Sequence, residues 1–261
     1  MKRTDSTTRF SDRVSDYIRY RPHYPDEVVS YLEEEWNISP GSHIADIGSG
    51  TGISCKPFLE RGYTVTGIEP NEAMREAAVA LLQAYRQFSS LAATAEATTL
   101  PDNSIDVIMA AQAFHWFDQP AAQREFSRIL KPGGLIVLMW NERLAVSDFE
   151  KAYDELIVRH ATDYVQIDHR NIDQQSIEAF FAPNKCSYKV FPNFQQFDFE
   201  GLKGRLLSSS YIPKEGQDGY EAMIHELRAL FDQYQFAGYI RINYDTKVYS
   251  AKADGWRPDH K

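Results

Sequence analysis

The first half of the chain alternates short apolar runs with longer stretches in which apolar residues recur at helical spacing. The runs are Ile44 to Ile47, Thr64 to Ile68, Ile105 to Ala111 and Leu135 to Trp140. Two helical faces stand out, one made of Met74, Ala77, Ala78, Leu81, Leu82 and Tyr85 and the other of Ala122, Phe126, Ile129 and Leu130. Strands separated by helices predict a parallel sheet with right-handed crossovers, because a parallel strand needs a helix-length return. The nearly continuous apolar character of the runs indicates that helices cover both faces of the sheet.

Two later segments show a different pattern, in which apolar and polar side chains alternate strictly. These segments are residues 186–190 and 240–248. Strict alternation is typical of half-exposed strands, so we predict antiparallel strands at the end of the sheet.

Helical segments outside the sheet are expected to form a cap. Near the start of the chain, Val28, Leu32 and Trp36 follow Pro25 at helical spacing, and proline suits a first helical turn. A longer helical stretch separates the two alternating strands, and its apolar face consists of Tyr220, Met223, Ile224, Leu227, Leu230, Phe231 and Tyr234. We therefore expect a single domain over residues 1–261, with a core at 37–141, 184–194 and 239–250 and a helical cap from 1–36, 144–183 and 195–238.

Composition and charge exclude several classes of function. The 261 residues are 43% hydrophobic and 25% charged, and the formal net charge of −9 argues against a nucleic-acid partner. The longest apolar run is far shorter than the roughly 20 residues that a membrane span needs, so no membrane association is expected. Cys55 and Cys186 lie at neither metal-ligand nor redox spacing, which predicts no metal site and two thiols in a reducing cytoplasm.

A glycine-rich turn after the first predicted strand is the most informative segment of the chain. Gly48, Gly50 and Gly52 follow that strand at alternate positions, and glycine lets a ligand approach the backbone closely. The carboxyl ends of strands border the ligand crevice in open α/β sheets. Glu69 follows the second strand, where a carboxylate accepts ribose hydroxyls. The third glycine comes one residue too early for a dinucleotide fingerprint, yet the acid alone does not separate NAD from another adenosine ligand.

Five ordered motifs extend this turn over roughly residues 40–141. They are Ala45 to Gly52, Gly67 to Met74, Ala95 to Asp102, Ser104 to Ile108 and Leu130 to Gly134. In this order they resemble the class I S-adenosylmethionine-dependent methyltransferases, which implies a Rossmann-like, doubly wound, mostly parallel sheet of about seven strands with an antiparallel strand near the C-terminus. The segments Tyr20 to Pro25 and His115 to Asp118 also resemble trans-aconitate methyltransferase-like enzymes, which methylate small molecules.

The resemblance implies a binding site for S-adenosylmethionine and its product S-adenosylhomocysteine. Gly48, Gly50 and Gly52 are expected against the methionyl and ribose parts, Glu69 on the ribose, and Ala95 and Glu96 beside the adenine. Gln112 is expected to meet the methionyl moiety, and Tyr20 and Arg21 to close over the cofactor carboxylate. The full expected set is Tyr20, Arg21, Asp46, Gly48, Ser49, Gly50, Gly52, Glu69, Ala95, Glu96 and Gln112. One departure from the family pattern is Pro57, which should kink or shorten the first helix.

The acceptor side of the reaction is less constrained. Methyl transfer is an in-line displacement, so a base is needed only where the acceptor carries a proton that must leave. His115 is the candidate base for a hydroxyl acceptor, Trp116 a candidate pocket wall, and Arg143 a candidate partner for a substrate carboxylate. Arg143, Arg205 and Tyr211 also fit ordinary solvated side chains, and the spacing of Tyr17, Tyr20 and Tyr24 also fits a plain amphipathic helix.

We therefore predict methyl transfer to a small-molecule carboxylate or hydroxyl oxygen. An NAD-dependent oxidoreductase, a non-catalytic nucleoside sensor and a macromolecular methyltransferase remain as alternatives.

Overall fold

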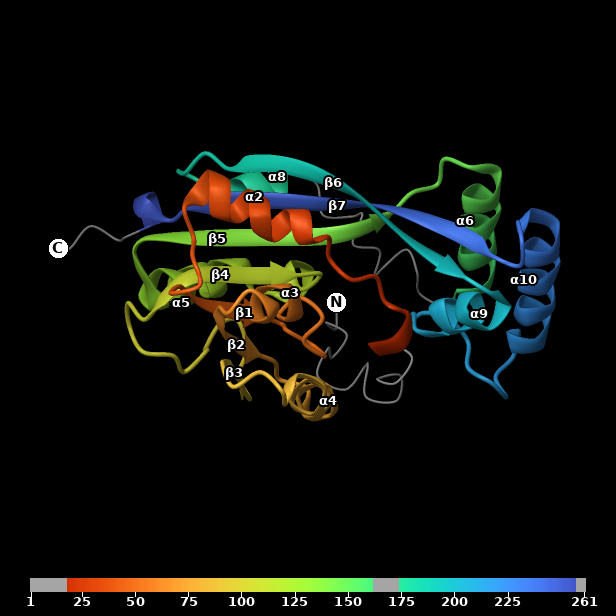
Figure 1. Ribbon diagram of the computed structural model, residues 1–261, viewed down its shortest axis with the longest axis horizontal. Helices are drawn as coiled ribbons and strands as arrows, with labels where there is room; N and C mark the ends of the chain where they lie inside the picture. Colours follow the sequence, from red (N-terminus) through yellow and green to blue (C-terminus); the bar gives the residue numbers. More distant parts are fainter. Residues whose placement is uncertain (1–17, 162–173, 257–261) are drawn as a thin grey trace.

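A seven-stranded sheet forms the centre of the computed structural model, which describes residues 18–161 and 174–256. Its strands are β1 (His43–Ile47), β2 (Thr64–Ile68), β3 (Phe88–Leu91), β4 (Ile105–Ala111), β5 (Leu130–Arg143), β6 (Ser187–Phe197) and β7 (Ile240–Lys252). The strand order is β3-β2-β1-β4-β5-β7-β6, with the first five strands parallel and β7 antiparallel to both of its neighbours (Figure 1). This arrangement confirms the predicted fold class. Tyr17 and the parts of the predicted cap at 1–17 and 162–173 lie outside the described residues.

The predicted strand bounds agree for β2 and β4, and β1 begins one residue earlier than predicted. β5 is longer than its apolar run, because its pairing with β7 continues through Arg143. β3 was not assigned from the sequence. It is a short edge strand with two serines at its centre and carries no continuous apolar run.

Helices cover both faces of the sheet. One face packs against α2 (Asp26–Trp36), α3 (Lys56–Glu60) and α4 (Glu72–Leu82). The other packs against α5 (Gln119–Ile129), α8 (Gln174–Phe181) and the 3₁₀ turn η3 (Asp254–Trp256). The assignment of α2 and α8 to the cap was therefore wrong, since Val28 and Leu32 of α2 and Phe180 of α8 are buried against the sheet.

Two helical details also differ from the sequence expectation. The helix after the glycine turn was expected near Thr51, but α3 begins at Lys56, with Pro57 in its first turn. Proline is tolerated there because its missing N–H would have no helical partner, so the expected shortening of this helix is observed. Leu81 was expected on the buried face of α4 but is 47% exposed.

The cap consists of α6 (Asp148–His160), α9 (Phe199–Leu207) and α10 (Tyr220–Tyr234). Figure 1 shows these helices gathered at one end of the molecule, beyond the carboxyl ends of β4 and β5. β6 and β7 run out of the sheet into this cap, where Phe197, Ile240 and Ile242 join its apolar core. The long strands therefore attach the cap to the carboxyl edge of the sheet. Within the two described stretches, no helix has both the length and the apolar character needed to cross a bilayer.

Candidate functional site

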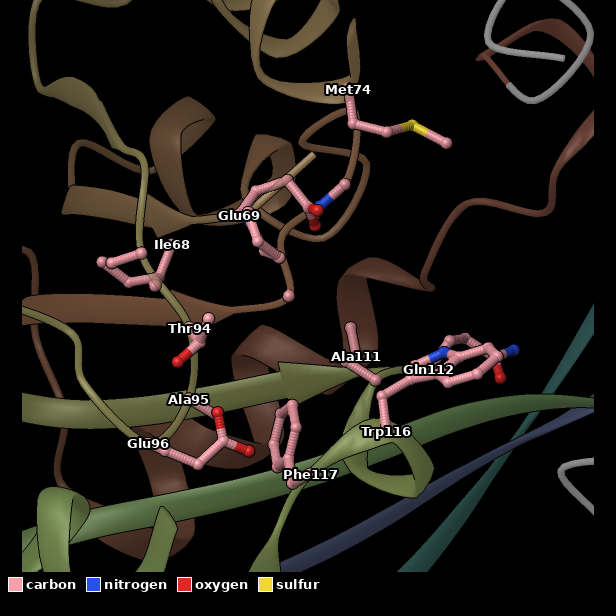
Figure 2. A pocket seen from close by; sticks show the side chains of 15 residues that line it. Ile68, Glu69, Met74, Thr94, Ala95, Glu96, Ala111, Gln112, Trp116 and Phe117 are labelled. Carbon is pink, nitrogen blue, oxygen red and sulfur yellow. The ribbon is translucent and has the colours of Figure 1, made fainter. Parts of the chain in front are cut away.

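A pocket opens at the carboxyl ends of β1, β2 and β4, on the edge of the sheet that faces the cap. It encloses roughly 870 Å³ of empty space when its open mouth is included. Its lining residues are Gly48, Gly50, Ile68, Glu69, Pro70, Met74, Ala93, Thr94, Ala95, Glu96, Ala111, Gln112, Ala113, Trp116 and Phe117. Figure 2 shows Met74 and Glu69 on one side of this space, with Glu96 and Phe117 opposite and Gln112 and Trp116 at one end. Of the predicted cofactor residues, this set contains Gly48, Gly50, Glu69, Ala95, Glu96 and Gln112.

The three glycines of the turn serve different purposes. All have positive φ angles, which favour glycine. A Cβ on Gly48 would lie 2.5 Å from the Cβ of Ala113, whereas a Cβ on Gly50 would meet nothing within 4 Å. Since Gly50 lines the pocket, this open space gives a ligand direct access to the backbone. A Cβ on Gly52 would lie 2.5 Å from Leu82 of α4, and Gly52 is absent from the pocket wall, so it serves packing.

Glu69 presents a nearly buried carboxylate to the pocket, with 9% of the residue exposed. Its Oε2 accepts the backbone N–H of Gly50 at 3.0 Å, and its Oε1 accepts that of Asn71 at 2.9 Å. Asn71 in turn caps α4 by accepting the N–H of Met74. Burial raises the pKa of Glu69, and these backbone N–H groups partly oppose the rise. Each oxygen keeps a further lone pair, so the carboxylate retains acceptor capacity for two ligand hydroxyls.

Asp46, predicted as a cofactor residue, does not line the pocket. It is fully buried beneath the turn, where its Oδ2 accepts Ser54 Oγ at 2.5 Å and Cys55 Sγ at 3.1 Å. Burial raises the pKa of Asp46 to about 6, although the bonds from Ser54 and Cys55 act in the opposite direction. This carboxyl therefore ties the strand end to the segment after the glycine turn. Ser49 is likewise buried and outside the lining, with its backbone N–H on the carbonyl of Ile68.

The wall opposite Glu69 contains small residues and one aromatic ring. Ala95 lies on the same side of the pocket as the ring of Phe117 (Figure 2), and Ala93 also lines the pocket. Glu96 accepts the backbone N–H of Asp118 at 2.8 Å, which connects this wall to the segment after β4. Phe117 and Met74 were not predicted as site residues. Met74 was assigned to the buried face of α4, and that assignment is correct because it is 3% exposed, but the face borders the pocket as well as the core.

Gln112 occupies the end of β4 in a strained backbone conformation, with φ of 57°. Its N–H donates to Met139 O at 2.9 Å, and its Nε2 donates to Asn141 O at 3.1 Å, both on β5. A non-glycine residue in this region of φ costs on the order of 1 kcal/mol and is common at ligand sites. The Gln112 side chain lines one end of the pocket, where the resemblance leads us to expect the methionyl group (Figure 2).

Three further predicted residues, Tyr20, Arg21 and His115, also lie away from the pocket lining. Tyr20 packs on Gly204 of α9, and its carbonyl accepts Gln195 Nε2. Arg21 donates to Ser208 O at 3.0 Å. Both therefore fasten the segment before α2 to the cap, whereas closure over the cofactor was expected. His115 stands in the 3₁₀ turn η1 (Phe114–Trp116) with its ring 4.7 Å from that of Trp116; only Trp116 of this pair lines the pocket.

Arg143, predicted to meet a substrate carboxylate, is already paired with a carboxylate of the protein. Its Nη2 forms an ion pair with Asp154 Oδ1 of α6, and its guanidinium lies over the ring of Tyr153 at 5.0 Å. Its side chain is 11% exposed. The solvated alternative for Arg143 is thus wrong, and the side chain belongs to the interface between β5 and the cap.

Comparisons with known proteins agree with this architecture. Residues 45–138 match the family model described as a methyltransferase domain. A Mycobacterium tuberculosis protein named as an uncharacterized methyltransferase is 37% identical over 141 residues, which are 54% of this chain and 55% of that protein, so the similarity spans about half of each. Two solved structures share the fold. One is a candidate type II methyltransferase from Anaeromyxobacter dehalogenans, with a TM-score of 0.66 and 22% identity, covering 90% of this chain and 98% of that one.

The other is phosphoethanolamine N-methyltransferase 2 of Haemonchus contortus, solved with S-adenosyl-L-methionine. It has a TM-score of 0.57 and 17% identity, covering 95% of this chain and 58% of that one. The matched domain, the strand order and the pocket formed by the glycine turn and Glu69 lead to one assignment. Residues 45–138 carry a methyltransferase domain, and the chain has the Rossmann-like methyltransferase fold.

Proposed function

We propose that this protein transfers the methyl group of S-adenosylmethionine to a carboxylate or hydroxyl oxygen of a small molecule. The observation that carries the proposal is the pairing of Glu69 with the glycine turn. A nearly buried carboxylate with spare acceptor capacity faces a backbone that leaves open space at Gly50. This combination suits a ribose with two adjacent hydroxyls.

The rest of the pocket fits the remaining parts of the cofactor. Ala93, Ala95 and Phe117 are apolar lining residues that suit an adenine ring, and Glu96 lies beside Phe117 (Figure 2). Gln112 and Trp116, at the opposite end of the lining, are placed to border the sulfonium side. The bound cofactor supplies an electrophilic methyl group on sulfur.

The protein's own task is to align the acceptor oxygen with that methyl group in a site shielded from water. An oxygen lone pair forms the new C–O bond while the C–S bond breaks, so the sulfonium becomes a neutral thioether. Alignment of this kind contributes on the order of 7 to 11 kcal/mol. A carboxylate acceptor loses no proton, so the site then requires no base. For a hydroxyl acceptor the departing proton needs one, and His115 next to Trp116 remains the predicted base.

A small acceptor fits the molecule better than a macromolecule. The net charge of −9 disfavours an RNA partner, and the cap lies at the end of the molecule toward which the carboxyl ends of β4 and β5 point (Figure 1). Free thiols at Cys55 and Cys186 are consistent with a reducing cytoplasm, where we place the reaction. The resemblance to trans-aconitate methyltransferase-like enzymes stays a prediction within this proposal.

Isothermal titration calorimetry with S-adenosylhomocysteine, with NADH as the matched control ligand, tests the cofactor. We expect binding of the first compound and none of the second; the reverse result would convert the assignment to an oxidoreductase. Incubation with methyl-labelled cofactor and a fractionated metabolite extract, read by mass spectrometry, tests the transfer. A labelled acid or ether supports the proposal, whereas cofactor binding with no labelled product supports the sensor alternative.

A further inference from the structure

A buried arginine, Arg205, lies inside the cap. Arg205 of α9 is 7% exposed and sits beside the apolar core of the cap. Its Nε donates to Tyr244 Oη at 3.1 Å, and its Nη1 lies 3.5 Å from Ser208 Oγ. Across residues 18–161 and 174–256, no Asp or Glu side chain forms an ion pair with it. Burying a cation among neutral groups is costly unless an anion joins it, because desolvation is not repaid by charge pairing.

A second polar group close to Arg205 also lacks a partner. The hydroxyl of Tyr153 on α6 is fully buried and makes no hydrogen bond to any part of the chain that the structure describes. Burial raises the pKa of Tyr153 to about 12, while the positive charges of Arg205 and Arg143 act to lower it. An unsatisfied buried hydroxyl costs about 1 to 3 kcal/mol. Both groups are donors, so a single acceptor-rich ligand satisfies them together.

Two neighbours of Arg205 and Tyr153, namely Tyr244 and Arg143, already have protein partners. Tyr244 Oη donates to Gln195 Oε1 at 2.9 Å while it accepts Arg205 Nε. Arg143 is neutralised by Asp154 and lies over the ring of Tyr153, so it positions the tyrosine. Among the described residues, Nη2 of Arg205 and the hydroxyl of Tyr153 are the polar atoms of this pair that have no hydrogen-bond partner.

We propose that Arg205 and Tyr153 form an anion-binding subsite in the cap that holds a carboxylate of the methyl acceptor. A carboxylate has two oxygens in one plane, which matches a guanidinium edge and leaves a lone pair for a tyrosine hydroxyl. The subsite rests on the proposed function only for the statement that its ligand is the acceptor. The presence of the subsite is a property of the cap alone.

Strand register sets the length of such an acceptor. Ala111, which lines the pocket, is paired with Met139 of β5, and Tyr244 is paired with Arg143, four residues further along that strand. At about 3.3 Å per residue, the Tyr244 level lies roughly 13 Å beyond the pocket level. The anchored carboxylate is therefore distinct from the atom that receives the methyl group. We infer an elongated acceptor with an anion at one end and a methyl-accepting oxygen on the order of 10 Å away.

Straight-chain dicarboxylates of four to ten carbons are suitable probes, since they carry both features, and their diamides are matched uncharged controls. We expect calorimetry on the wild-type protein with saturating S-adenosylhomocysteine to detect at least one diacid and none of the diamides. Arg205→Met should weaken that diacid by about 10- to 150-fold, the range for a lost charged hydrogen bond. Tyr153→Phe should weaken it about 3- to 10-fold. Arg241→Gln, on an exposed arginine of β7, is the control and should leave it within about twofold.

Stability separates this role from a structural one. A buried cation held for a ligand destabilises the empty protein, so Arg205→Met should leave the melting temperature unchanged or raise it. A lowered melting temperature together with undiminished diacid binding would assign Arg205 to the scaffold and overturn the proposal, as would the absence of diacid binding to the wild type. Arg205→Lys, which keeps the charge without the planar fork, provides a second variant if the methionine variant does not fold.

Failure of the proposed function is distinguishable from failure of the subsite. If the wild-type protein does not bind S-adenosylhomocysteine, the methyltransferase proposal fails. The diacid and diamide titrations then proceed without that compound and still decide whether Arg205 and Tyr153 bind an anion.

Discussion

Replacing Glu69 by glutamine tests the central feature of the pocket with a minimal change in shape. In the native protein each carboxylate oxygen accepts one backbone N–H, from Gly50 and from Asn71. Glutamine keeps one oxygen and replaces the other by an NH₂ group, which cannot accept. One of the two backbone groups therefore loses its acceptor, and the ribose loses the ionised partner that the proposal gives it.

The expected loss of affinity in Glu69→Gln follows from the strength of hydrogen bonds to a charged group, which contribute about 1.5 to 3 kcal/mol each. Loss of one ribose hydrogen bond should weaken binding of S-adenosylhomocysteine about 10- to 150-fold. The unsatisfied N–H at Gly50 or Asn71 should also lower the free energy of unfolding by about 1 to 3 kcal/mol. Since Glu69 is only 9% exposed, solvent screening reduces these values little.

Proton linkage supplies a second readout of the same substitution. Burial raises the pKa of Glu69, so the carboxyl binds a proton at a higher pH than an ordinary glutamate. Ribose binding uses the ionised form. Wild-type affinity should therefore fall as the pH drops through this raised pKa, and the glutamine variant should lack that part of the dependence.

Calorimetry with S-adenosylhomocysteine across a pH series, with chemical unfolding in parallel, measures all three effects. Glu72→Gln is the matched control, because Glu72 is an exposed acid three residues away at the start of α4. A folded Glu69→Gln protein that binds within threefold of the wild type at every pH would show that Glu69 serves only the turn, and the ribose assignment would be refuted.

Three further predictions concern neighbouring residues. Gly50→Ala should reduce the affinity for S-adenosylhomocysteine at least tenfold, and the positive φ at this position should lower stability by about 1 to 2 kcal/mol. Gly48→Ala should lower stability further, because its new Cβ would lie 2.5 Å from Ala113. Calorimetry and thermal unfolding of both variants test these expectations. Burial raises the pKa of Asp46 to about 6 in the folded protein, against 3.8 for the free group, so the folded state binds more protons than the unfolded state between these values. The free energy of unfolding should therefore fall by roughly 3 kcal/mol as the pH rises from about 4 to 6. Urea unfolding across this pH range should detect the fall in the wild type and not in Asp46→Asn. His115→Ala should abolish the basic limb of the pH–rate profile if the acceptor is a hydroxyl and leave the profile unchanged if it is a carboxylate.

The central sheet was predictable because its signals are local. Largely apolar runs at β1 and β4 indicate strands buried on both faces, and the alternating pattern of β7 indicates a strand exposed on one. β3 lacks such a signal because it is a four-residue edge strand with two serines at its centre. Pro57 correctly predicted that α3 is short, because proline constrains helix geometry whatever lies around it.

The site was only partly predictable, because its walls come from segments that meet only after folding. Gly50 and Glu69 carry their chemistry in their own residue type and strand position, and both line the pocket. Asp46 stands two residues before the first glycine and was expected at the ligand, yet its side chain points beneath the turn to Ser54 and Cys55. Only the three-dimensional path of the turn distinguishes a carboxylate that faces the cofactor from one that holds the loop.

The cap was the least predictable part, because contacts of α9 with β6 and β7 bury an arginine that the sequence suggests is solvated. The sequence of α9 around Arg205 resembles an ordinary amphipathic surface helix, which favours a solvated arginine. Burial arises because β6 and β7 continue past the sheet and bring Gln195 and Tyr244 against α9, an extension that the alternating pattern predicts in kind but not in length.

β5 connects this cap to the pocket. Asn141 accepts Gln112 Nε2 with its carbonyl, while its side-chain Oδ1 accepts Thr246 Oγ1 of β7 at 2.5 Å. Two residues later, Arg143 pairs with Asp154 of the cap. The Gln112 end of the pocket and the cap interface are therefore fixed to the same strand, so the sheet would set the position of an acceptor held at the proposed cap subsite relative to the pocket. On this proposal, selectivity among acceptors depends on the distance between the two ends of this strand segment.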